Sequence, residues 1–425
     1  MISLILFGAF IFLLAVGAPI GVALGLATVV ALLVDGTVTM TVVAQKILAA
    51  NNSFPLLAVP FFMFAGAVMT EGGISKRLID FVYTLVGSIR GGLAMVATVT
   101  AMFFAAISGS SAATCAAIGS SLIPAMKQKG YDEEYSAAVI AAAGTTGIVI
   151  PPSTPMVVYG VVAGVSIGEL FLGGFIPGIL MGLAMMVVIY FQAKKRGYVG
   201  EKRSDIKTVW KTFIDASWGL MMPVIILGGI YGGIFTPTES AAIASFYGLF
   251  VTLFIYKEKK FADIPKIMGK AVVATAIVMF IISMAGLFSW ILTANRIPQA
   301  MAALFLSLTT NPLYIMMLIN VLLLFVGTFL NATAAISILV PVLFPVITKV
   351  GIDPVAFGVI MTVNLAIGCI TPPVGVDLFV AQSISGISIE RITRSVFPLL
   401  MALIGVLLLV TFVPELILLI PSTMK

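Results

Sequence analysis

Apolar runs of about 20 residues recur from one end of the chain to the other, and this feature constrains the fold more than any other. A helix of that length spans the hydrocarbon core of a bilayer. Only 9% of the 425 residues are charged, whereas soluble domains carry about a quarter. The runs show no strand-type alternation and are too long for barrel strands. The sequence therefore predicts an all-α polytopic membrane protein.

The chain has no histidine and only two cysteines, which excludes several kinds of chemistry. Without His there are no Ser–His or Cys–His nucleophile pairs, no imidazole metal sites and no imidazole proton relays. Cys115 and Cys369 lie far apart in apolar stretches, where we expect small buried side chains. Because a metal-ligand cluster and a closely spaced pair of intramembrane acids are also absent, we do not predict an enzyme. Nothing in the sequence points to a nucleic-acid partner.

Charged and turn residues divide the chain into ten predicted crossings and two interrupted apolar segments. The crossings lie near 3–16, 19–34, 53–70, 131–165, 169–193, 218–236, 239–256, 273–293, 353–386 and 395–420. The segments 91–124 and 312–346 each hold two short apolar arms broken by small polar residues, and we expect re-entrant hairpins there. The stretches 75–90 and 298–308 mix charges or turn residues with apolar positions, which predicts interfacial arm helices.

The 23 basic residues are divided unequally between the two sides that this path defines. One side receives 19 of them, and the other receives Lys46, Arg296, Lys349 and Lys425. The positive-inside rule assigns the larger group to the cytoplasm, so both termini are predicted outside it. If either hairpin segment crossed the membrane once, the basic loops after it would move to the other side, and the division of 19 to 4 would become less unequal. The unequal division of basic residues therefore supports both hairpins. The basic stretch 194–211 is interpreted as a lipid-facing linker, with docking of a partner as the alternative.

The two halves of the chain match at a constant offset of 221 residues. Three helix-breaking positions recur in register at this offset. They are Gly147, Pro151 and Pro152 in the first half and Gly368, Pro372 and Pro373 in the second. The first half has an odd number of crossings, so the second half enters the membrane from the opposite side. This is an inverted-topology repeat, an architecture found in many secondary transporters.

Each double proline predicts a helix that is broken at membrane depth. Proline has no N–H, so Pro151 and Pro152 leave the carbonyls of Gly147 and Ile148 without helical donors. The second proline pair acts on Gly368 in the same way. Free carbonyls inside a membrane are tolerated only within protein or beside a hydrated cavity, and in transporters they commonly coordinate Na⁺. A simple proline kink is the alternative.

The tips of the two predicted hairpins are rich in small and polar residues. They run from Ser108 to Thr114 and from Gly327 to Thr333. Ser, Thr and Asn favour helix N-caps, so each tip can begin a second arm and offer free N–H groups to an anion. Close packing of small residues is the alternative, but it does not explain Asn331 at an apolar depth.

Two further sequence features, the pattern at Thr236–Glu239 and the acidic residue Asp377, can each be interpreted in two ways. Thr236 followed by Glu239, with Pro237 at the first helical position, is a capping-box pattern, and an ion or proton site at Glu239 is the alternative. Asp377 follows the second double proline by four residues. It either lines a cavity or is solvated near the break.

Together these motifs resemble the large membrane subunit (M, DctM-like) of the tripartite ATP-independent periplasmic (TRAP) transporters over nearly the whole chain. The motifs are Ser108–Thr114, Gly147 with Pro151–Ser153, Gly232–Ala241, and Thr371–Gly375 with Leu378–Phe379. The resemblance implies an elevator-type transporter of the bacterial inner membrane, with hairpins and broken helices in a moving transport domain. It also implies Na⁺ coupling, a small membrane subunit, and a periplasmic binding protein that delivers an organic acid.

The resemblance further implies two Na⁺ sites, hence at least two ions per substrate, and no organic cofactor. The first site comprises Ser108, Gly109, Ser110, Ser111, Gly144, Gly147 and Ile148. The second site comprises Gly327, Asn331, Thr333, Gly368, Ile370, Thr371 and Gly375. The predicted substrate-binding residues are Ser110, Ser111, Ser153, Thr154, Asn331 and Asp377. Many family members carry Asp at the position of Asn331, where this chain has a neutral amide.

Sialic acid is the favoured substrate, because the sequence as a whole is most similar to sialic-acid members, and C4-dicarboxylates come next. The alternative function is a stand-alone Na⁺/dicarboxylate or ion antiporter that needs no binding protein. The predicted division gives scaffold and arm to 1–90 and 216–311, and the transport domain to 91–168 and 312–390. The remaining segments are a crossing at 169–193, a cytoplasmic linker at 194–215 and a terminal crossing at 391–425.

Overall fold

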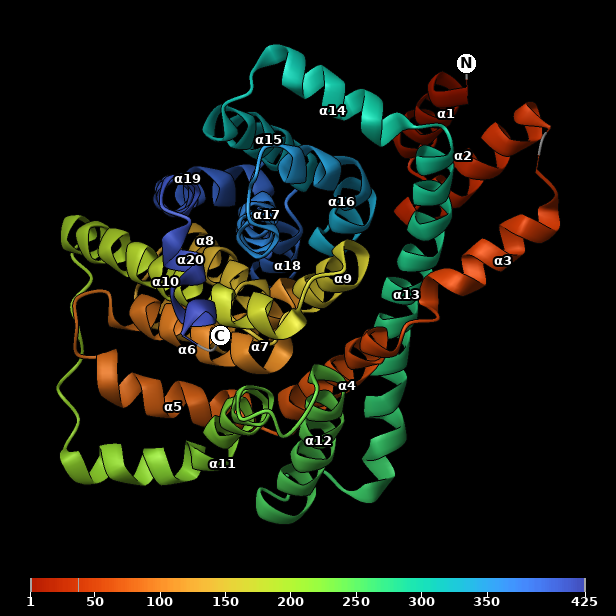
Figure 1. Ribbon diagram of the computed structural model, residues 1–425. Coiled ribbons are helices and arrows are strands. Elements are labelled where there is room, and N and C mark those ends of the chain that lie inside the picture. Colours follow the sequence, from red (N-terminus) through yellow and green to blue (C-terminus); the bar gives the residue numbers. More distant parts are fainter. Residues whose placement is uncertain (1, 37, 424–425) are drawn as a thin grey trace.

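The structure is a computed structural model that describes residues 2–36 and 38–423, and the regular structure of these residues is helical (Figure 1). Seven helical stretches in this part of the chain are long and apolar enough to cross a membrane. They are Phe54–Glu71, Ile167–Arg196, Ile206–Tyr231, Pro237–Ile255, Phe261–Ala294, Ala332–Lys349 and Ile389–Phe412. Shorter apolar helices supply the other predicted crossings, singly or as two helices in series. The prediction of an all-α polytopic membrane protein is confirmed.

The described residues of the first half form ten α-helices. They are α1 (Ile2–Ala15), α2 (Ile20–Asp35), α3 (Met40–Asn51), α4 (Ala58–Glu71), α5 (Ile74–Val86), α6 (Gly92–Ser108), α7 (Ser111–Gln128), α8 (Glu133–Gly144), α9 (Thr154–Ala163) and α10 (Ile167–Arg196). Helices α6 and α7 are the predicted first hairpin, and α5 is the predicted arm. Helices α8 and α9 are the two parts of the first broken helix, separated by a 3₁₀ turn at Thr145–Ile148 and the double proline.

The second half repeats this order. It contains α11 (Ile206–Tyr231), α12 (Pro237–Phe250), α13 (Ile264–Ala294), α14 (Ile297–Leu308), α15 (Pro312–Gly327), α16 (Ala332–Lys349), α17 (Pro354–Gly368), α18 (Val376–Ser385), α19 (Ile389–Phe412) and α20 (Glu415–Ser422). Helices α15 and α16 form the second hairpin, α14 is the second arm, and α17 with α18 is the second broken helix. The predicted inverted repeat with two hairpins and two broken helices is confirmed.

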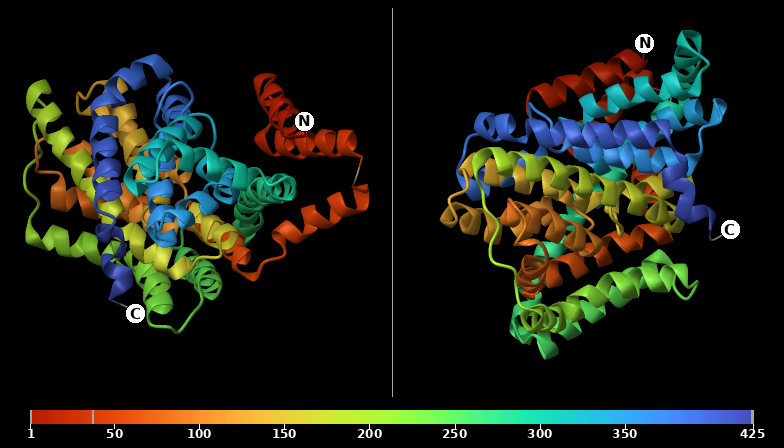
Figure 2. Two further views of the ribbon diagram at one scale, coloured as in Figure 1. Left: turned by 45° about the horizontal axis from the view of Figure 1, so that its top comes forward. Right: turned by 90° about the vertical axis from the view of Figure 1, so that its left-hand side faces the viewer.

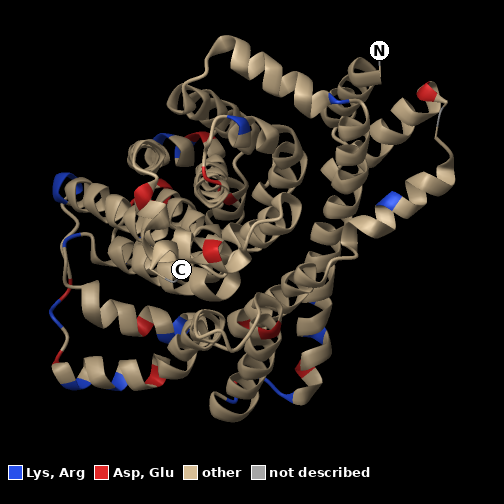
Figure 3. Ribbon diagram, viewed as in Figure 1, with Lys and Arg blue, Asp and Glu red and all other residues tan. Residues whose placement is uncertain are grey.

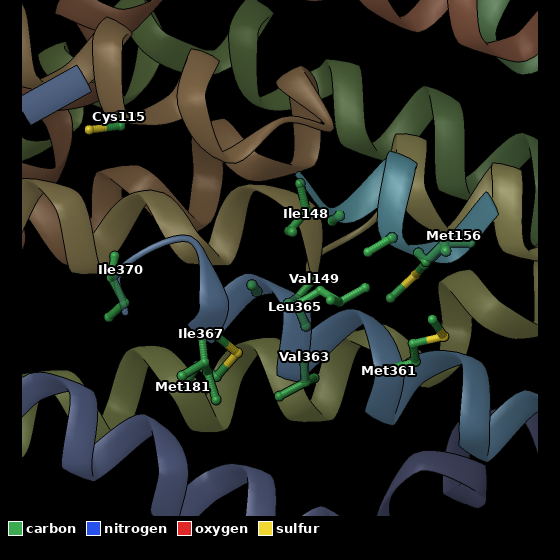
Figure 4. Close-up of a cluster of buried hydrophobic side chains, with 14 of the residues drawn as sticks. Cys115, Ile148, Val149, Met156, Met181, Met361, Val363, Leu365, Ile367 and Ile370 are labelled. Atoms are coloured by element: carbon green, nitrogen blue, oxygen red, sulfur yellow. The ribbon is translucent and has the colours of Figure 1, made fainter. Parts of the chain in front are cut away.

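The core of the molecule is centred on the first parts of the two broken helices. Every residue of α17 from Val355 to Gly368 is buried, and so is every residue of α8 from Tyr135 to Gly144. Helix α17 is enclosed by α15, α16, α10, α19 and α9, as its central place in Figure 1 shows. Figure 4 shows the apolar packing at this centre, where Val149 of the first break lies beside Leu365 of α17.

Helices α13, α4, α2 and α12 form a separate wall beside this core. Helix α13 packs against α2, α3, α4 and α16, and α12 packs against α4 and α11. In Figure 1, α1, α2 and α3 project beyond α13, away from the broken helices. The right-hand view of Figure 2 shows many helices nearly parallel, with the 197–205 linker at one end of the stack and α20 at the other.

Ion pairs among the described residues test the path of the chain through the membrane. Arg77 lies 2.9 Å from Glu258, and Arg391 lies 2.8 Å from Glu134. Each pair requires an even number of crossings between its members. The first interval contains hairpin α6–α7 and four crossings, and the second contains hairpin α15–α16 and six crossings. Each hairpin must therefore return to the side from which it entered.

All seven ion pairs of the described residues use basic residues from the side predicted to be cytoplasmic. Lys and Arg are concentrated around α11 and at the end of α10 (Figure 3). One pair joins the α7–α8 loop to the linker after α10, and its hydrogen bond from Lys129 to Glu201 raises the pKa of Lys129. Lys425, which was assigned to the opposite side, lies outside the described residues.

Several elements differ from the sequence prediction. Helix α13 begins at Ile264, before the predicted start of its crossing at 273. Helix α11 begins at Ile206, within the predicted linker, because Ile206, Val209, Trp210 and Phe213 repeat at helical spacing and form an amphipathic start of the helix. Helix α3 was not predicted. Helix α19 ends at Phe412 and α20 follows as a separate helix, because Pro414 disfavours helical backbone in the residue before it.

Candidate functional site

The first break is held together by a side chain that replaces the missing helical donor. The Ser153 hydroxyl donates to the carbonyl of Ile148 at 2.5 Å and accepts from the backbone N–H of Met156 at 3.3 Å. Ser153 is therefore also the N-cap of α9. The stretch from Gly144 to Tyr159 is buried throughout. The prediction of a broken helix within the protein is confirmed here.

The first hairpin tip is ordered by two hydroxyl groups that converge on one backbone carbonyl and by a third that caps α7. Ser108 and Thr114 lie 2.7 Å apart at their oxygens, and both hydroxyls lie within 3.3 Å of the carbonyl oxygen of Ser110. The Ser110 hydroxyl accepts from the backbone N–H of Ala113 at 3.4 Å and caps α7. A Cβ at Gly147 would lie 2.6 Å from the Ser110 carbonyl oxygen, so tip and break touch at backbone level.

The second break is built on the same plan but holds fewer side-chain hydrogen bonds. The Thr371 hydroxyl donates to the carbonyl of Ile367 at 2.8 Å. The backbone N–H of Asp377 donates to the carbonyl of Cys369 at 2.9 Å across the double proline. Pro373 is exposed, and Thr371 is partly exposed. Gly375 has φ +62°, a left-handed conformation that glycine adopts most readily.

The second hairpin tip contains the predicted cap at Asn331. Its side-chain oxygen accepts from the backbone N–H of Ala334 at 2.8 Å, which leaves the amide N–H₂ group available to donate. A Cβ at Gly368 would lie 2.7 Å from the Cα of Gly327, so this tip and its break also touch at backbone level. Asn331 and Ser110 are matching positions at the offset of 221 residues.

One backbone hydrogen bond ties each tip to its own break, and the two donors are at matching positions although the two acceptors are not. Thr154 N–H donates to the carbonyl of Gly109 at 3.3 Å, and Gly375 N–H donates to the carbonyl of Thr328 at 3.1 Å. Thr154 and Gly375 are related by the offset of 221 residues. Hairpin and broken helix therefore form one unit in each half.

The two units meet at a cavity of about 170 Å³. Its lining consists of Gly109, Ser110, Ser111, Ala112, Ile148, Thr154 and Pro155 from the first half, Asn331, Ala332, Thr333, Cys369 and Val376 from the second, and Met63 and Val278 from α4 and α13. None of these lining residues is charged. The N-termini of α7 and α16 both begin at this cavity, where their first N–H groups can bind an anion.

Four of the six predicted substrate-binding residues line the cavity. They are Ser110, Ser111, Thr154 and Asn331. The Thr154 side chain is 5% exposed, and its hydroxyl oxygen has no hydrogen-bond partner in the described residues. Ser153 and Asp377 are each 0% exposed and are not part of the lining.

The predicted ion-site residues divide between the cavity and the space behind it. Gly109, Ser110, Ser111, Ile148, Asn331 and Thr333 line the cavity. The others lie outside its lining and are Ser108, Gly144, Gly147, Gly327, Gly368, Ile370, Thr371 and Gly375. Of these residues, Gly144, Gly147, Gly327, Gly368 and Gly375 take part in the close contacts between a tip and its break.

Several residues of the site were not identified from the sequence. Met63 and Val278 come from the wall outside the repeat motifs, and no local signal marks an apolar residue as a cavity residue. Thr114 lies in the predicted tip Ser108–Thr114 but was not assigned to an ion site, although its hydroxyl could have indicated such a role. Cys115 and Cys369 are buried and not disulfide-bonded, as expected, but Cys369 also lines the cavity.

The pattern at Thr236 is a structural cap. The Thr236 hydroxyl accepts from the backbone N–H of Glu239, and the Glu239 carboxylate accepts from the backbone N–H of Thr236 at 2.8 Å. This reciprocal pair is the predicted capping box, with Pro237 in the first turn. The Glu239 carboxylate therefore takes part in hydrogen bonds at the N-terminus of α12, as the structural interpretation predicts.

The sequence matches one protein family over residues 7–416, the family described as "Tripartite ATP-independent periplasmic transporter, DctM component". The isethionate TRAP transporter permease protein DctMQ of Oleidesulfovibrio alaskensis is 49% identical over 411 residues, which cover 96% of this chain and 65% of that protein. The chain thus spans slightly less than two thirds of that relative's length.

Two other relatives match along nearly their whole length. The C4-dicarboxylate TRAP transporter large permease protein DctM of Pseudomonas aeruginosa is 43% identical, over 94% of this chain and 93% of that protein. The sialic acid TRAP transporter large permease protein SiaM of Vibrio cholerae is 40% identical, over 96% of each. Among solved structures, the Alcanivorax borkumensis YdaH transporter aligns with a TM-score of 0.65 at 18% identity, over 88% of this chain and 87% of that one. The last likeness shows a shared fold alone.

Proposed function

The chain belongs to the DctM component family of the tripartite ATP-independent periplasmic transporters, and from this premise we propose that it imports an organic acid by secondary active transport coupled to Na⁺. The observation that carries the proposal is the single cavity at which both hairpin tips and both breaks meet. The protein would be the large permease subunit, embedded in the bacterial inner membrane as a multi-pass protein with both termini in the periplasm.

The substrate anion would bind at the N-termini of α7 and α16. Each terminus offers backbone N–H groups and the positive end of a helix dipole. The free amide N–H₂ of Asn331 and the unpartnered hydroxyl of Thr154 add donors on the same cavity wall. Because the lining holds no charged side chain, hydrogen bonds and helix ends would compensate the charge of the substrate.

The Na⁺ ions would bind behind the cavity, one in each unit of tip and break. The first ion would use Ser108 to Ser111 with Gly144, Gly147 and Ile148, and the second would use the second-half residues named above. Oxygen ligands suit a hard cation such as Na⁺. The Ile148 carbonyl accepts one hydrogen bond from Ser153 and retains a second lone pair for an ion.

Transport would proceed by an elevator movement of the two units past the wall of α4 and α13. The contribution of Met63 and Val278 to the cavity supports this division, because the cavity then lies at the boundary between the two parts. The moving domain would comprise 91–168 and 312–390, and the scaffold would comprise 1–90 and 216–311. The crossing at 169–193, the linker at 194–215 and the segment 391–425 would connect them.

The substrate is one of several organic anions. The named relatives are transporters of isethionate, C4-dicarboxylate, sialic acid and 2,3-diketo-L-gulonate. The identities do not support the expected greater similarity to sialic-acid members, because the sialic acid permease is 40% identical, whereas the isethionate and C4-dicarboxylate permeases are 49% and 43% identical. We therefore treat sialic acid, C4-dicarboxylate and isethionate as equal candidates. A small membrane subunit and a periplasmic binding protein would complete the transporter.

Variants at the two matching N-cap positions test the ion sites. Ser110→Ala or Asn331→Ala should raise the Na⁺ concentration for half-maximal uptake about fivefold, equivalent to ~1 kcal/mol for a lost cap or ligand. The measurement is uptake into proteoliposomes that contain the permease with its small subunit and binding protein. Ser120→Ala on the exposed side of α7 is the matched control and should leave the Na⁺ dependence unchanged.

Unchanged Na⁺ dependence in both cap variants would contradict the assigned ion sites. Uptake that proceeds equally well when K⁺ replaces Na⁺ would contradict Na⁺ coupling itself. Uptake of freely dissolved substrate by the chain alone, without a binding protein, would instead support a stand-alone antiporter.

A further inference from the structure

Beyond Glu133 and Glu134 in the first turn of α8, Asp377 is the one charged residue in α8, α9, α17 and α18, the helices that make up the two broken helices. Its side chain is 0% exposed, and neither carboxylate oxygen has a hydrogen-bond partner in the described residues. No Lys or Arg of those residues forms an ion pair with it. A buried carboxylate without a partner is strongly unfavourable, so this position either takes up a proton or gains a compensating cation.

The surroundings of Asp377 place it between the two halves of the site. Helix α18, which carries Asp377, packs against α7 and α8 of the first half. The Cys115 thiol donates to the backbone carbonyl of Asp377 at 3.7 Å, and Asp377 N–H donates to the carbonyl of Cys369 at 2.9 Å. The Ser111 hydroxyl donates to the Cys369 sulfur at 3.8 Å.

These contacts leave Asp377 behind the cavity and next to both proposed ion sites. It lies two residues after Gly375 of the second site, and its neighbour Cys369 contacts Ser111 of the first site. It is not part of the cavity lining, so we assign it to the ions instead of the substrate anion. Like-charge repulsion would also oppose a contact with that anion.

We propose that Asp377 is the anionic counter-charge for the transported Na⁺, shared by the two ion sites and contributed by the second half alone. This inference rests on the Na⁺ coupling proposed above. The matching position in the first half is Met156, so the repeat supplies this charge once. The proposed sites otherwise offer neutral oxygens. A buried negative charge therefore raises Na⁺ affinity at both sites, because charges interact strongly in a low-dielectric interior.

The test measures Na⁺ binding without transport. The purified full-length chain is titrated with NaCl at constant ionic strength against choline chloride, and the thermal unfolding midpoint is recorded. Asp377→Asn removes the charge at nearly constant volume, and it should raise the Na⁺ concentration for half-maximal stabilisation about tenfold or more. Glu390→Gln removes an exposed charge and should match the wild type.

A second substitution keeps the test valid if Asp377→Asn does not fold. Asp377→Glu retains the charge, and Asp377→Ser removes it with a smaller side chain. The glutamate variant should respond to lower Na⁺ concentrations than the serine variant. A Na⁺ response of the asparagine variant equal to the wild type, or equal responses of the glutamate and serine variants, would overturn the role of Asp377. Absence of a Na⁺ response in the wild type would overturn the proposed Na⁺ coupling as well.

Discussion

The two broken helices follow one sequence plan but sit in different surroundings. Around the first double proline, every residue from Gly144 to Tyr159 is buried. Around the second, Pro373 is exposed, and Thr371, Pro372 and Val374 are partly exposed. The hairpins differ in the same direction, because α6 and α7 lie along each other, whereas α15 and α16 contact each other over a much shorter length.

This difference shows that two halves with the same sequence motifs can differ in how tightly their broken helices are packed. The first unit is held by packing on all sides and by the Ser153 hydroxyl. The second unit has fewer neighbours at its break, so its conformation depends more on the groups that bind there. We therefore expect substitutions in the first unit to affect stability and those in the second to affect ligand response. Three predictions test this comparison, beginning with the largest expected effect.

Gly147→Ala and Gly368→Ala insert a methyl group at matching contacts between tip and break. The new Cβ would lie 2.5 Å from the Thr114 hydroxyl at position 147 and 2.7 Å from the Gly327 backbone at position 368. Overpacking of this kind costs about 1–3 kcal/mol. We expect both variants to lose uptake, and Gly147→Ala to lower the thermal unfolding midpoint further.

Gly228→Ala is the control for this pair, because a Cβ there would meet no atom within 4 Å. It should retain both uptake and stability. Equal losses of stability in the variants at 147 and 368 would contradict the proposed difference between the units.

Ser153→Ala removes the side chain that holds the first break. It deletes the hydrogen bond to the Ile148 carbonyl and the cap on Met156, so we expect a loss of about 1–2 kcal/mol in the free energy of unfolding. The matching residue in the second half is Val374, whose substitution by Ala should have little effect on stability. Denaturant unfolding of both variants measures the difference, and equal losses would break the comparison.

Asn364→Ala removes a buried polar contact that the second half alone contains. The Asn364 amide donates to the backbone and side-chain oxygens of Asn320 at 3.0 Å, and Asn320 donates to Thr411 at 2.9 Å. Hydrogen bonds between membrane helices contribute about 0.6 kcal/mol on average, so we expect a small loss of stability. The matching residue in the first half is Ala143, so Asn364→Ala gives the second half the residue that the first half has at this position. A midpoint shift as large as that of Ser153→Ala would contradict this ranking.

The features that the sequence predicted correctly are those that depend on local chemistry. Apolar length determines which segments cross, and the missing N–H of proline determines where Pro151 and Pro372 interrupt their helices. The capping box at Thr236 follows from three residues in one turn. The charge bias predicted which loops share a side, and the ion pair between Glu134 and Arg391 agrees with it.

The features that the sequence did not predict depend on packing between distant segments. Nothing local distinguishes Met63 or Val278 from other apolar membrane residues, although both reach the cavity. The full burial of Asp377 depends on α7 and α8, which are more than 200 residues away in sequence. The first turn of α11 was missed because its charges suggested a linker, while its apolar residues at helical spacing carried the opposite signal.

The apolar face that α4 and α13 present to the cavity also bears on kinetics. Dispersion contacts such as those of Met63 and Val278 have no preferred direction. A hairpin that is displaced along this face would therefore exchange one apolar contact for a similar one. The barrier to such sliding then depends on side-chain volume more than on bond strength. If the hairpins move past this face as proposed, enlarging Val278 should slow their passage, and trimming it should accelerate their passage. Because Val278 also lines the cavity, enlarging it should reduce the space left for the substrate as well.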